Sequence, residues 1–147
     1  MNSFADLAER LSRMANPGGD KAYLEAVGAK IEKDAKEIIG HYQRSDTGPF
    51  PEWEELAPST KADRVSKGFT PNDPLLRSGE LRDSIRHEVR GNSVAIGSDL
   101  DIAIYQEMGT STIPPRPFLR VAAWRSKKWL GKLYAKTLKD RINGRHL

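Results

Sequence analysis

The sequence predicts an α+β fold: a small, mostly antiparallel β-sheet with packed helices, a helical N-terminus and a long basic C-terminal helix. Apolar residues recur every three to four positions before residue 43 and again after residue 117, and these two stripes predict helices. A third observation predicts the sheet, because apolar and polar residues alternate on both sides of a turn within 86–97. The 147 residues fit one domain, 1–147.

Two helices are expected before residue 43. The first spans Ser3 to Met14 and ends at the breaker Asn16-Pro17-Gly18-Gly19. The second runs from Asp20 to about Tyr42, and Gly40 weakens its last turn. Their apolar stripes consist of Phe4, Leu7, Ala8 and Leu11 in the first helix and of Leu24, Val27, Ile31, Ile38 and Tyr42 in the second.

Two irregular arms are expected in the middle of the chain, at about 43–58 and 68–77, because glycine and proline recur in both. Between them a short helix runs from Ser59, its expected N-cap, to Lys67. The arms carry the aromatic residues Phe50, Trp53 and Phe69. These rings either anchor a partner or fold back over the core, and the sequence leaves both interpretations open.

The predicted sheet lies in the segment that follows the second arm. Ser78 to Leu81 begins a short helix, and a hairpin follows at 86–97 with Gly91-Asn92 at its turn. The alternating apolar-side positions are Ile85, His87 and Val89 before the turn and Val94 and Ile96 after it. The apolar run Ile102–Met108 fits a buried strand or a short helix, and periodicity does not decide between them.

The C-terminal part begins with a proline-rich, extended connector at 114–117 and continues as a long basic helix from about Phe118 to Ile142. Pro117 suits the first turn of this helix, since its fixed φ matches a helix start and a missing N–H costs nothing there. The expected apolar face consists of Phe118, Val121, Ala122, Trp129 and Leu133.

The charge of the chain is divided unevenly along its length. Residues 110–147 contain ten lysines and arginines but one acid, Asp140, so their net charge is +9 and that of residues 1–109 is −5. A molecule with opposite poles suits binding to an acidic surface or head-to-tail contact between its own copies. No apolar run approaches the ~20 residues that span a bilayer, so no membrane contact is expected.

We expect no enzymatic activity, no cofactor and no metal. The chain has no cysteine, which excludes thiol nucleophiles and cysteine–zinc sites. His41, His87 and His146 lack the spacing of metal ligands, and neither a phosphate-binding glycine loop nor a nucleophile elbow occurs. The acids Asp99, Asp101 and Glu107 lack the dense alternation of oxygen ligands and the turn glycine that calcium loops need.

The basic helix suits two kinds of partner. Its cations follow each other at three- and four-residue steps, as on the solvated face of an amphipathic helix. They are Arg125, Lys128, Lys132, Lys136 and Lys139. Contact with an acidic protein surface is the favoured interpretation. The alternative is a nucleic-acid-binding module with non-specific DNA contact, in which these cations meet phosphates and nearby aromatic rings stack on bases. Those rings are Trp124, Trp129 and Tyr134.

Three motifs occur in a fixed order along the chain. They are Trp53-x-x-Leu56-x-x-x-Thr60, the segment Leu75–Ile85 (L-x-x-S-G-x-L-x-x-S-I), and Tyr105–Thr110 followed by Ile113–Leu119. Their order and spacing resemble the phage virion morphogenesis and tail-completion family of Mu-like phages, and the related minor tail or neck proteins of long-tailed phages. The resemblance covers about residues 50–124.

The resemblance implies a structural protein of a tailed-phage particle that completes the tail or joins the tail to the head. It implies an oligomeric ring, with phage tail or head–tail connector proteins as partners, located in the tail or neck of the virion and in the host cytoplasm during assembly. The candidate assembly residues are Trp53, Gly79, Leu81, Glu107, Gly109, Arg116, Pro117, Phe118, Arg125, Lys128 and Lys132.

Physical reasons favour some of these candidates. Gly79 permits close approach at a helix start, and Gly109 can take a positive φ where a strand or helix ends. Arg116 and Phe118 form a pair of forked cation and apolar anchor that is common in interface hot spots, on a connector stiffened by proline. The alternative is that Phe118 belongs to the core and that Arg116 binds a local carbonyl.

Overall fold

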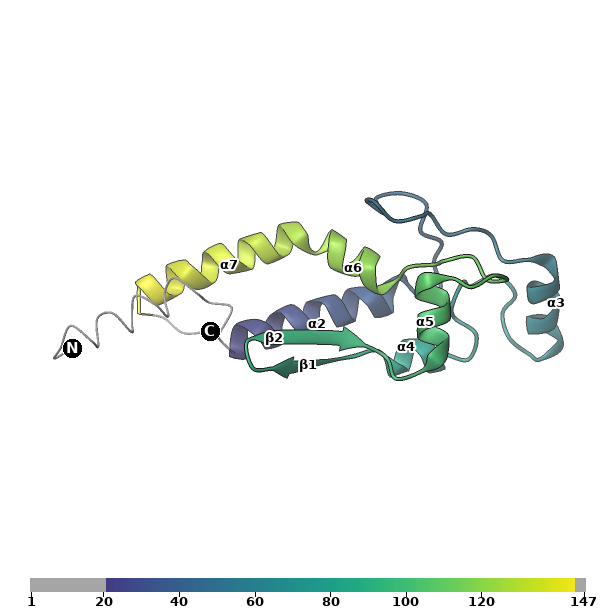
Figure 1. Ribbon diagram of the computed structural model, residues 1–147, viewed down its shortest axis with the longest axis horizontal. Helices are drawn as coiled ribbons and strands as arrows, with labels where there is room; N and C mark the ends of the chain where they lie inside the picture. Colours follow the sequence, from purple (N-terminus) through teal and green to yellow (C-terminus); the bar gives the residue numbers. More distant parts are fainter. Residues whose placement is uncertain (1–20, 145–147) are drawn as a thin grey trace.

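Helix α2 (Lys21–Ile38) is the central element of the structure, a computed structural model that describes residues 21–144. A β-hairpin covers one face of α2 and helix α6 covers another, so the elements form three layers with α2 in the middle (Figure 1). The α2 residues that this arrangement buries are Leu24, Val27, Gly28, Ile31 and Ala35. The helix expected at Ser3–Met14 lies outside the described residues.

Helix α2 is shorter than the sequence predicts, because it ends at Ile38 and not near Tyr42. Gly40 follows with a φ of 98°, a left-handed conformation that stops an α-helix. Its backbone N–H donates to the carbonyl oxygen of Pro74 at 2.8 Å, which ties the end of α2 to the second arm. The predicted weak point at Gly40 is therefore the actual helix end.

The predicted hairpin is confirmed. Strands β1 (Arg86–Arg90) and β2 (Ser93–Gly97) pair antiparallel, from Arg86 opposite Gly97 to Arg90 opposite Ser93. Gly91 in the turn has a φ of 59°, as this class of tight hairpin turn requires. Within residues 21–144 this hairpin is the whole sheet. The half-buried alternating positions are His87, Val89, Val94 and Ile96.

The hairpin packs closely on α2 because a glycine lies at the contact. A Cβ atom added to Gly28 would lie 2.5 Å from Cδ2 of His87 and 2.8 Å from Cγ2 of Val94. The imidazole of His87 lies between two carboxylates of the helix, with Nε2 2.9 Å from Glu25 and Nδ1 hydrogen-bonded to Glu32. Hydrogen bonds with Glu32 and Glu25 raise the pKa of His87, and burial opposes them.

Helix α3 (Pro58–Ser66) connects the two arms, and its start corrects the predicted cap. Ser59 is not the N-cap: Ala57 takes that position without a side-chain cap, and Pro58 occupies the first turn, where its missing N–H costs nothing. The buried Arg64 donates to the carbonyl oxygens of Asp73 and Leu76 at 2.7 and 3.1 Å. This arginine therefore fixes the second arm against α3.

Two short helices flank the hairpin. Helix α4 (Glu80–Ser84) begins where predicted, and Gly79 at its N-cap has a φ of 90°. The apolar run Ile102–Met108, for which periodicity left strand or helix open, lies in helix α5 (Asp101–Met108) and is not a strand. Ala103 and Glu107, four residues apart, are its buried positions. One side of α5 therefore faces the core.

The predicted long C-terminal helix is divided into α6 (Leu119–Arg125) and α7 (Lys127–Ile142). Ser126 lies between them, and its hydroxyl donates to the carbonyl oxygen of Ala122 at 2.8 Å. Such a bond from serine to the preceding turn bends helices, which accounts for the break. Pro117 precedes the N-cap Phe118 and lies outside the first turn. No helix in the described range 21–144 is long and apolar enough to span a membrane.

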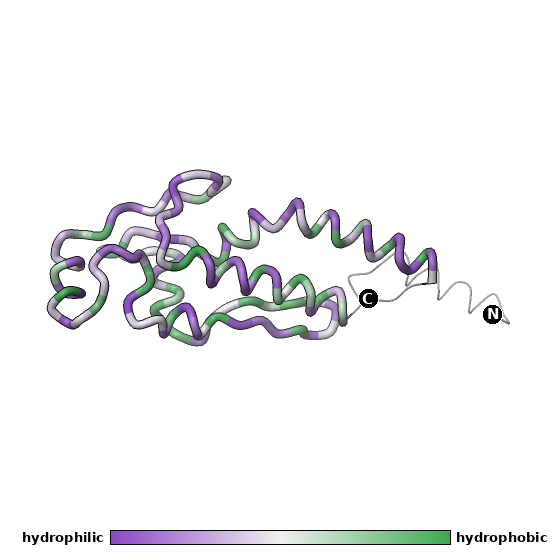
Figure 2. Tube along the Cα trace, turned by 180° about the vertical axis from the view of Figure 1, so that it is seen from behind, coloured by the Kyte–Doolittle hydropathy of each residue, from purple (hydrophilic) through white to green (hydrophobic). Residues whose placement is uncertain are grey.

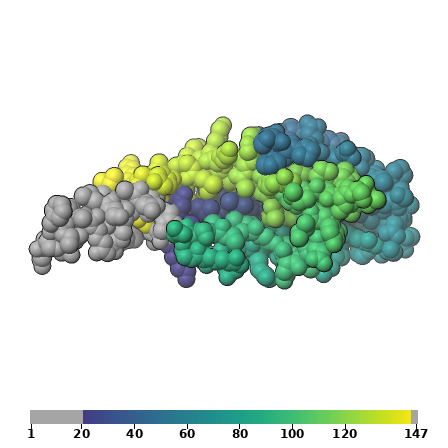
Figure 3. All heavy atoms as spheres, in the orientation of Figure 1, coloured from purple at the N-terminus to yellow at the C-terminus, as the bar shows by residue number. Residues whose placement is uncertain are grey.

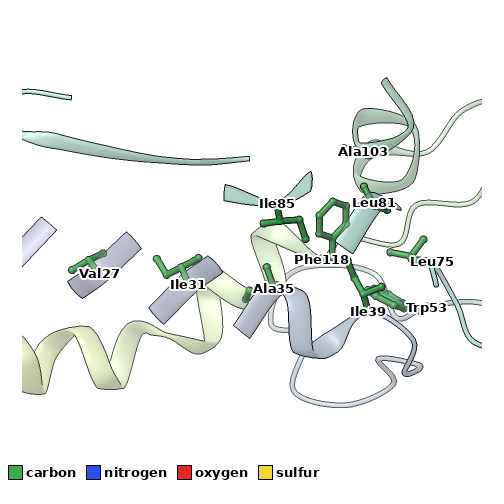
Figure 4. Close-up of a cluster of buried hydrophobic side chains, with 11 residues drawn as sticks. Val27, Ile31, Ala35, Ile39, Trp53, Leu75, Leu81, Ile85, Ala103 and Phe118 are labelled. Carbon is green, nitrogen blue, oxygen red and sulfur yellow. The ribbon is translucent and has the colours of Figure 1, made fainter. Parts of the chain in front are cut away.

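The core follows α2 and is widest at the C-terminal end of that helix. Figure 4 shows the side chains of α2 in a row that meets Trp53, Leu81, Ile85 and Phe118 at this end. Trp53, Ile85 and Phe118 are almost completely buried, at 1%, 1% and 0% exposure. The first arm therefore folds back to cover the core through Trp53. Phe50 and Phe69 are half-buried and lie beside Arg120 and Arg77.

Candidate functional site

The first and third sequence motifs meet in the structure. The indole Nε1 of Trp53 donates to the carbonyl oxygen of Pro117 at 3.1 Å. The guanidinium of Arg116 donates from Nε and Nη2 to the carbonyl oxygen of Glu54, at 3.0 and 2.8 Å, and from Nη2 to that of Glu55, at 3.2 Å. Residues 53–55 and 116–117, about 60 positions apart, are thereby held together.

Glu107 connects the two halves of the third motif. Its carboxylate accepts hydrogen bonds from the backbone N–H groups of Phe118, Leu119 and Arg120, at 2.7, 2.9 and 3.0 Å. These are N–H groups at the start of α6, which have no partner within their own helix. A carboxylate at a helix N-terminus is also favoured by the helix dipole. Glu107 of α5 is therefore the cap of α6, although it lies outside that helix.

Arg120 completes the connection between α5 and α6. Its Nε donates to the Glu107 carboxylate at 3.0 Å and its Nη2 to the Glu107 carbonyl oxygen at 2.7 Å. The Glu107 side chain is only 10% exposed, so its charge is compensated within the protein. Farther along, the N–H of Arg116 donates to the carbonyl oxygen of Gln106 at 2.6 Å. Residues 106–120 thus form a bonded unit, which we call the α5–α6 clamp.

The turn inside the clamp depends on a glycine. Gly109 has a φ of 77° at the end of α5, as predicted for this position. A Cβ atom there would lie 2.9 Å from both the ring nitrogen and Cδ of Pro115. The chain returns through Thr110, whose N–H donates to the carbonyl oxygen of Ile113 at 2.8 Å. Gly109 therefore lets the extended proline connector lie directly against the end of α5.

The clamp buries one side of α5 and leaves large apolar side chains on the other. Ile104 is 62% exposed and Met108 60% exposed, on a helix of eight residues. We call this surface the α5 face, and its residues are Ile102, Ile104, Tyr105 and Met108. Apolar patches of this kind on soluble proteins mark contact surfaces. The α5 face is therefore the candidate functional site of this chain.

Six of the residues that the sequence singled out for assembly are enclosed in the subunit. They are Trp53, Leu81, Glu107, Arg116, Pro117 and Phe118. The ring of Phe118 belongs to the core, as the alternative interpretation says. The cation of Arg116 binds carbonyl oxygens, but these belong to Glu54 and Glu55 and are distant in the sequence. Gly79 is also buried and serves the start of α4. Within the subunit these residues therefore make internal contacts.

Of the basic candidate residues, Arg125 is bound within the subunit, whereas Lys128 and Lys132 are exposed. Arg125 donates to the carbonyl oxygens of Asp46 and Ser45 and to Oε1 of Gln43, and so holds the first arm. Lys128 and Lys132 are exposed, and neither has an ion-pair partner among residues 21–144. Figure 2 shows α7 alternating between hydrophilic and hydrophobic residues along its length. The lysines therefore remain candidates for contact with an acidic partner.

The aromatic residues near the basic helix each pack against another residue of the subunit. Trp124 lies against the first arm, where a Cβ on Gly48 would be 2.3 Å from its ring. Trp129 lies beneath the amine of Lys30, 5.9 Å from the ring centre, and Tyr134 packs edge to face on Tyr23 at 6.3 Å. Each ring already has a neighbour inside the subunit. Stacking on nucleic-acid bases therefore loses support.

The acidic first arm is fixed by local ion pairs. Glu55 accepts from Lys61 at 2.7 Å and from Arg44 at 2.6 Å, and Asn72 adds a bond at 3.0 Å. These hydrogen bonds lower the pKa of Glu55 to about 2. The carboxylate is thus charged under all ordinary conditions and joins the first arm to α3 and the second arm.

The family model for the phage virion morphogenesis family matches residues 2–136. The chain belongs to this family. Its role is in the assembly or structure of phage particles, as the three motifs predict. No curated protein and no solved structure matches the chain.

Sequence reasoning missed the α5 face of this virion morphogenesis protein. Exposure of Ile104 and Met108 depends on which side of α5 the clamp buries, and that is decided by contacts with residues 116–120. One signal was present in the sequence. Pro117 and Phe118 directly precede α6, and neither is a serine, threonine, aspartate or asparagine that could cap it, which points to a cap from elsewhere.

Proposed function

We propose that this virion morphogenesis protein completes the tail, or joins the tail to the head, as several copies in a closed ring. The observation that carries the proposal is the family match over residues 2–136. The structure supports a role based on contact: the motif residues form an internal clamp, and the clamp presents an apolar helix face. The partners are then phage tail or head–tail connector proteins, in the tail or neck of the virion and in the host cytoplasm during assembly.

The proposed role involves no bond-making chemistry. The charged motif residues Glu107, Arg116 and Arg120 are bound to backbone groups and to each other. These contacts leave them engaged in the fold, whereas a general acid or base must reach a substrate. We therefore propose a structural protein that is not an enzyme.

Deletion of the gene in its own phage tests the function. We expect heads and tails to accumulate unjoined, or tails of irregular length, in electron micrographs of the lysate. Supplying the full chain from a plasmid restores infectious particles. Normal infectious particles from the deletion phage, without the plasmid, contradict the proposal.

A nucleic-acid-binding module is the second candidate, because the exposed Lys128 and Lys132 of α7 lack ion-pair partners among the described residues. A salt titration of duplex-DNA binding separates the two functions. Non-specific binding has a Kd of about 10⁻⁴–10⁻⁶ M near physiological salt. A Kd well below this range, with steep salt dependence, would favour the nucleic-acid module over the structural ring.

A further inference from the structure

The α5 face is an apolar surface that residues 21–144 leave uncovered. Ile104 and Met108 are 62% and 60% exposed, and Tyr105 and Ile102 beside them are 46% and 40% exposed. Residues 104 and 108 lie one helical turn apart, so their side chains form one continuous ridge. Covering such a ridge removes apolar surface from water, which favours association.

The α5 face cannot turn inward to hide these side chains. Ala103 and Glu107 hold the opposite side of the helix against the core, and Glu107 binds three backbone N–H groups of α6. Rotation of α5 would break these bonds and leave a carboxylate buried without partners, at a large cost. The surface is therefore held in place, and the rest of the described residues cannot cover it.

Acidic residues border the α5 face. Residues 98–109 contain Asp99, Asp101 and Glu107 and no lysine or arginine. Glu107 is enclosed, whereas Asp99 and Asp101 are exposed at the start of α5. Asp99 has one exposed neighbour of opposite charge, Arg86, at 3.6 Å, a surface pair that contributes little. The partner that fits is a basic surface with apolar residues.

Helix α7 of the same chain has this chemistry. It carries six lysines and arginines against one acid, Asp140. The lysines that are exposed and have no ion-pair partner within residues 21–144 are Lys127, Lys128, Lys132 and Lys139. Apolar surface accompanies them, since Tyr134 is 39% and Ile142 65% exposed. The two surfaces are complementary in charge and both are partly apolar.

Within one subunit the two surfaces do not meet. Figures 1 and 3 show α5 towards one end of the elongated molecule and α7 reaching the other end. A contact between them therefore requires a second copy. We propose that α7 of one subunit packs on the α5 face of the next, which is a head-to-tail contact. Repeated with a rotation that divides a full turn evenly and with no rise along the axis, it closes a ring. This inference rests on the proposed ring and identifies its interface.

Site-specific cross-linking tests the contact, because the chain contains no cysteine that would confuse the result. One preparation carries Met108→Cys and another carries Lys132→Cys, and the two are mixed and oxidised. We expect covalent dimers that contain one chain of each kind. Cross-links between two Met108→Cys chains, or none between the two kinds, would overturn the proposal. Val65→Cys, on an exposed residue of α3, replaces Met108→Cys as the control and should give no dimers.

Charge reversal tests the same contact in a second way. Lys128→Glu with Lys132→Glu, or Asp99→Lys with Asp101→Lys, should weaken self-association about tenfold or more. A chain with all four changes should recover much of the loss, since both surfaces are reversed together. Lys33→Glu, at an exposed lysine of α2, is the control and should leave association unchanged. Equal association of all variants would overturn the assignment.

Different results would contradict the ring and the contact between α5 and α7. If wild-type chains associate, alone or in particles, but neither cross-linking nor charge reversal affects α5 and α7, the interface is wrong and the ring stands. If wild-type chains remain single both in solution and in purified particles, the ring itself is wrong and so is the interface.

Discussion

Glu107 and Phe118 are joined by a hydrogen bond of 2.7 Å, in which the buried carboxylate of one accepts from the backbone N–H of the other. The two residues belong to different halves of the third motif. Together with the bonds to Leu119 and Arg120, this contact makes α5 and α6 a single unit. The fold thus explains the motif, and the outer side of α5 is the surface that we propose for assembly.

Glu107→Gln should destabilise the fold. An amide replaces one acceptor oxygen by a donor that faces other donors, so we expect the free energy of unfolding to fall by roughly 1–3 kcal/mol. Urea denaturation followed by tryptophan fluorescence measures this change. Glu52→Gln, at an exposed glutamate of the first arm, should change stability by less than about 0.5 kcal/mol. If both variants unfold like the wild type, Glu107 is not the cap described above.

Two glycine substitutions in helices should act in opposite directions. Gly28→Ala places a methyl group 2.5 Å from His87, so we expect a loss of roughly 1–3 kcal/mol despite the better helix propensity of alanine. Gly131→Ala in α7 meets no atom within 4 Å, so propensity alone should stabilise the protein by up to about 1 kcal/mol. Thermal unfolding of both variants checks the sign. A stabilised Gly28→Ala chain would show that the hairpin is not packed as closely as described.

The pairing of His87 with Glu32 and Glu25 should make stability depend on pH. Because the folded pKa of His87 is raised, its contribution is fully present below the ordinary histidine pKa and is lost as pH rises through the folded pKa. The pKa of Glu32 is lowered by hydrogen bonds from Lys36 and His87 that outweigh burial, so its contribution is lost only as pH falls towards acid.

Unfolding measured from pH 5.5 to 9 checks the histidine effect. We expect the wild type to lose stability from about pH 6.5 upward, the ordinary histidine value. His87→Gln should remove this dependence and cost about 1–2 kcal/mol at the acid end. His41→Gln, at an exposed histidine, should leave the wild-type profile unchanged. A His87→Gln profile that still falls with pH would place the titrating group elsewhere.

Arg116 should be required for folding, so its substitution should reduce the amount of folded protein. Its guanidinium is buried against the carbonyl oxygens of Glu54 and Glu55, and burial lowers its pKa. Arg116→Glu places a carboxylate against those oxygens, at a cost of roughly 3–5 kcal/mol or more. We expect little soluble folded protein, as measured by expression yield and circular dichroism. Arg90→Lys, at an exposed arginine of the hairpin, is the control. A folded Arg116→Glu chain would contradict the internal role.

Local patterns predicted much of the fold. The alternation around Gly91 indicated the hairpin, and the stripe from Leu24 to Ile38 indicated α2. The errors occurred at helix boundaries, which residues close in the sequence decide. Ser59 looked like a cap, but Pro58 already begins α3, and the hydroxyl of Ser126 breaks a helix whose periodicity looked continuous.

The site was harder to predict than the fold. Glu107 and Arg116 were identified as important by their motifs, but their partners lie 11 to 13 and about 60 residues away, so their internal roles depend on tertiary contacts. The α5 face depends in turn on those contacts. A single sequence shows that Ile104 and Met108 are apolar, but not that they are the exposed half of their helix.

Quantitative mass spectrometry of purified particles, against a major tail protein, gives the number of copies of this chain in each particle. That number tests most directly whether the chain is a structural ring of the virion. We expect several copies in every infectious particle, in a constant ratio to that tail protein. Infectious particles with less than one copy on average would show that the chain is not a structural ring of the virion.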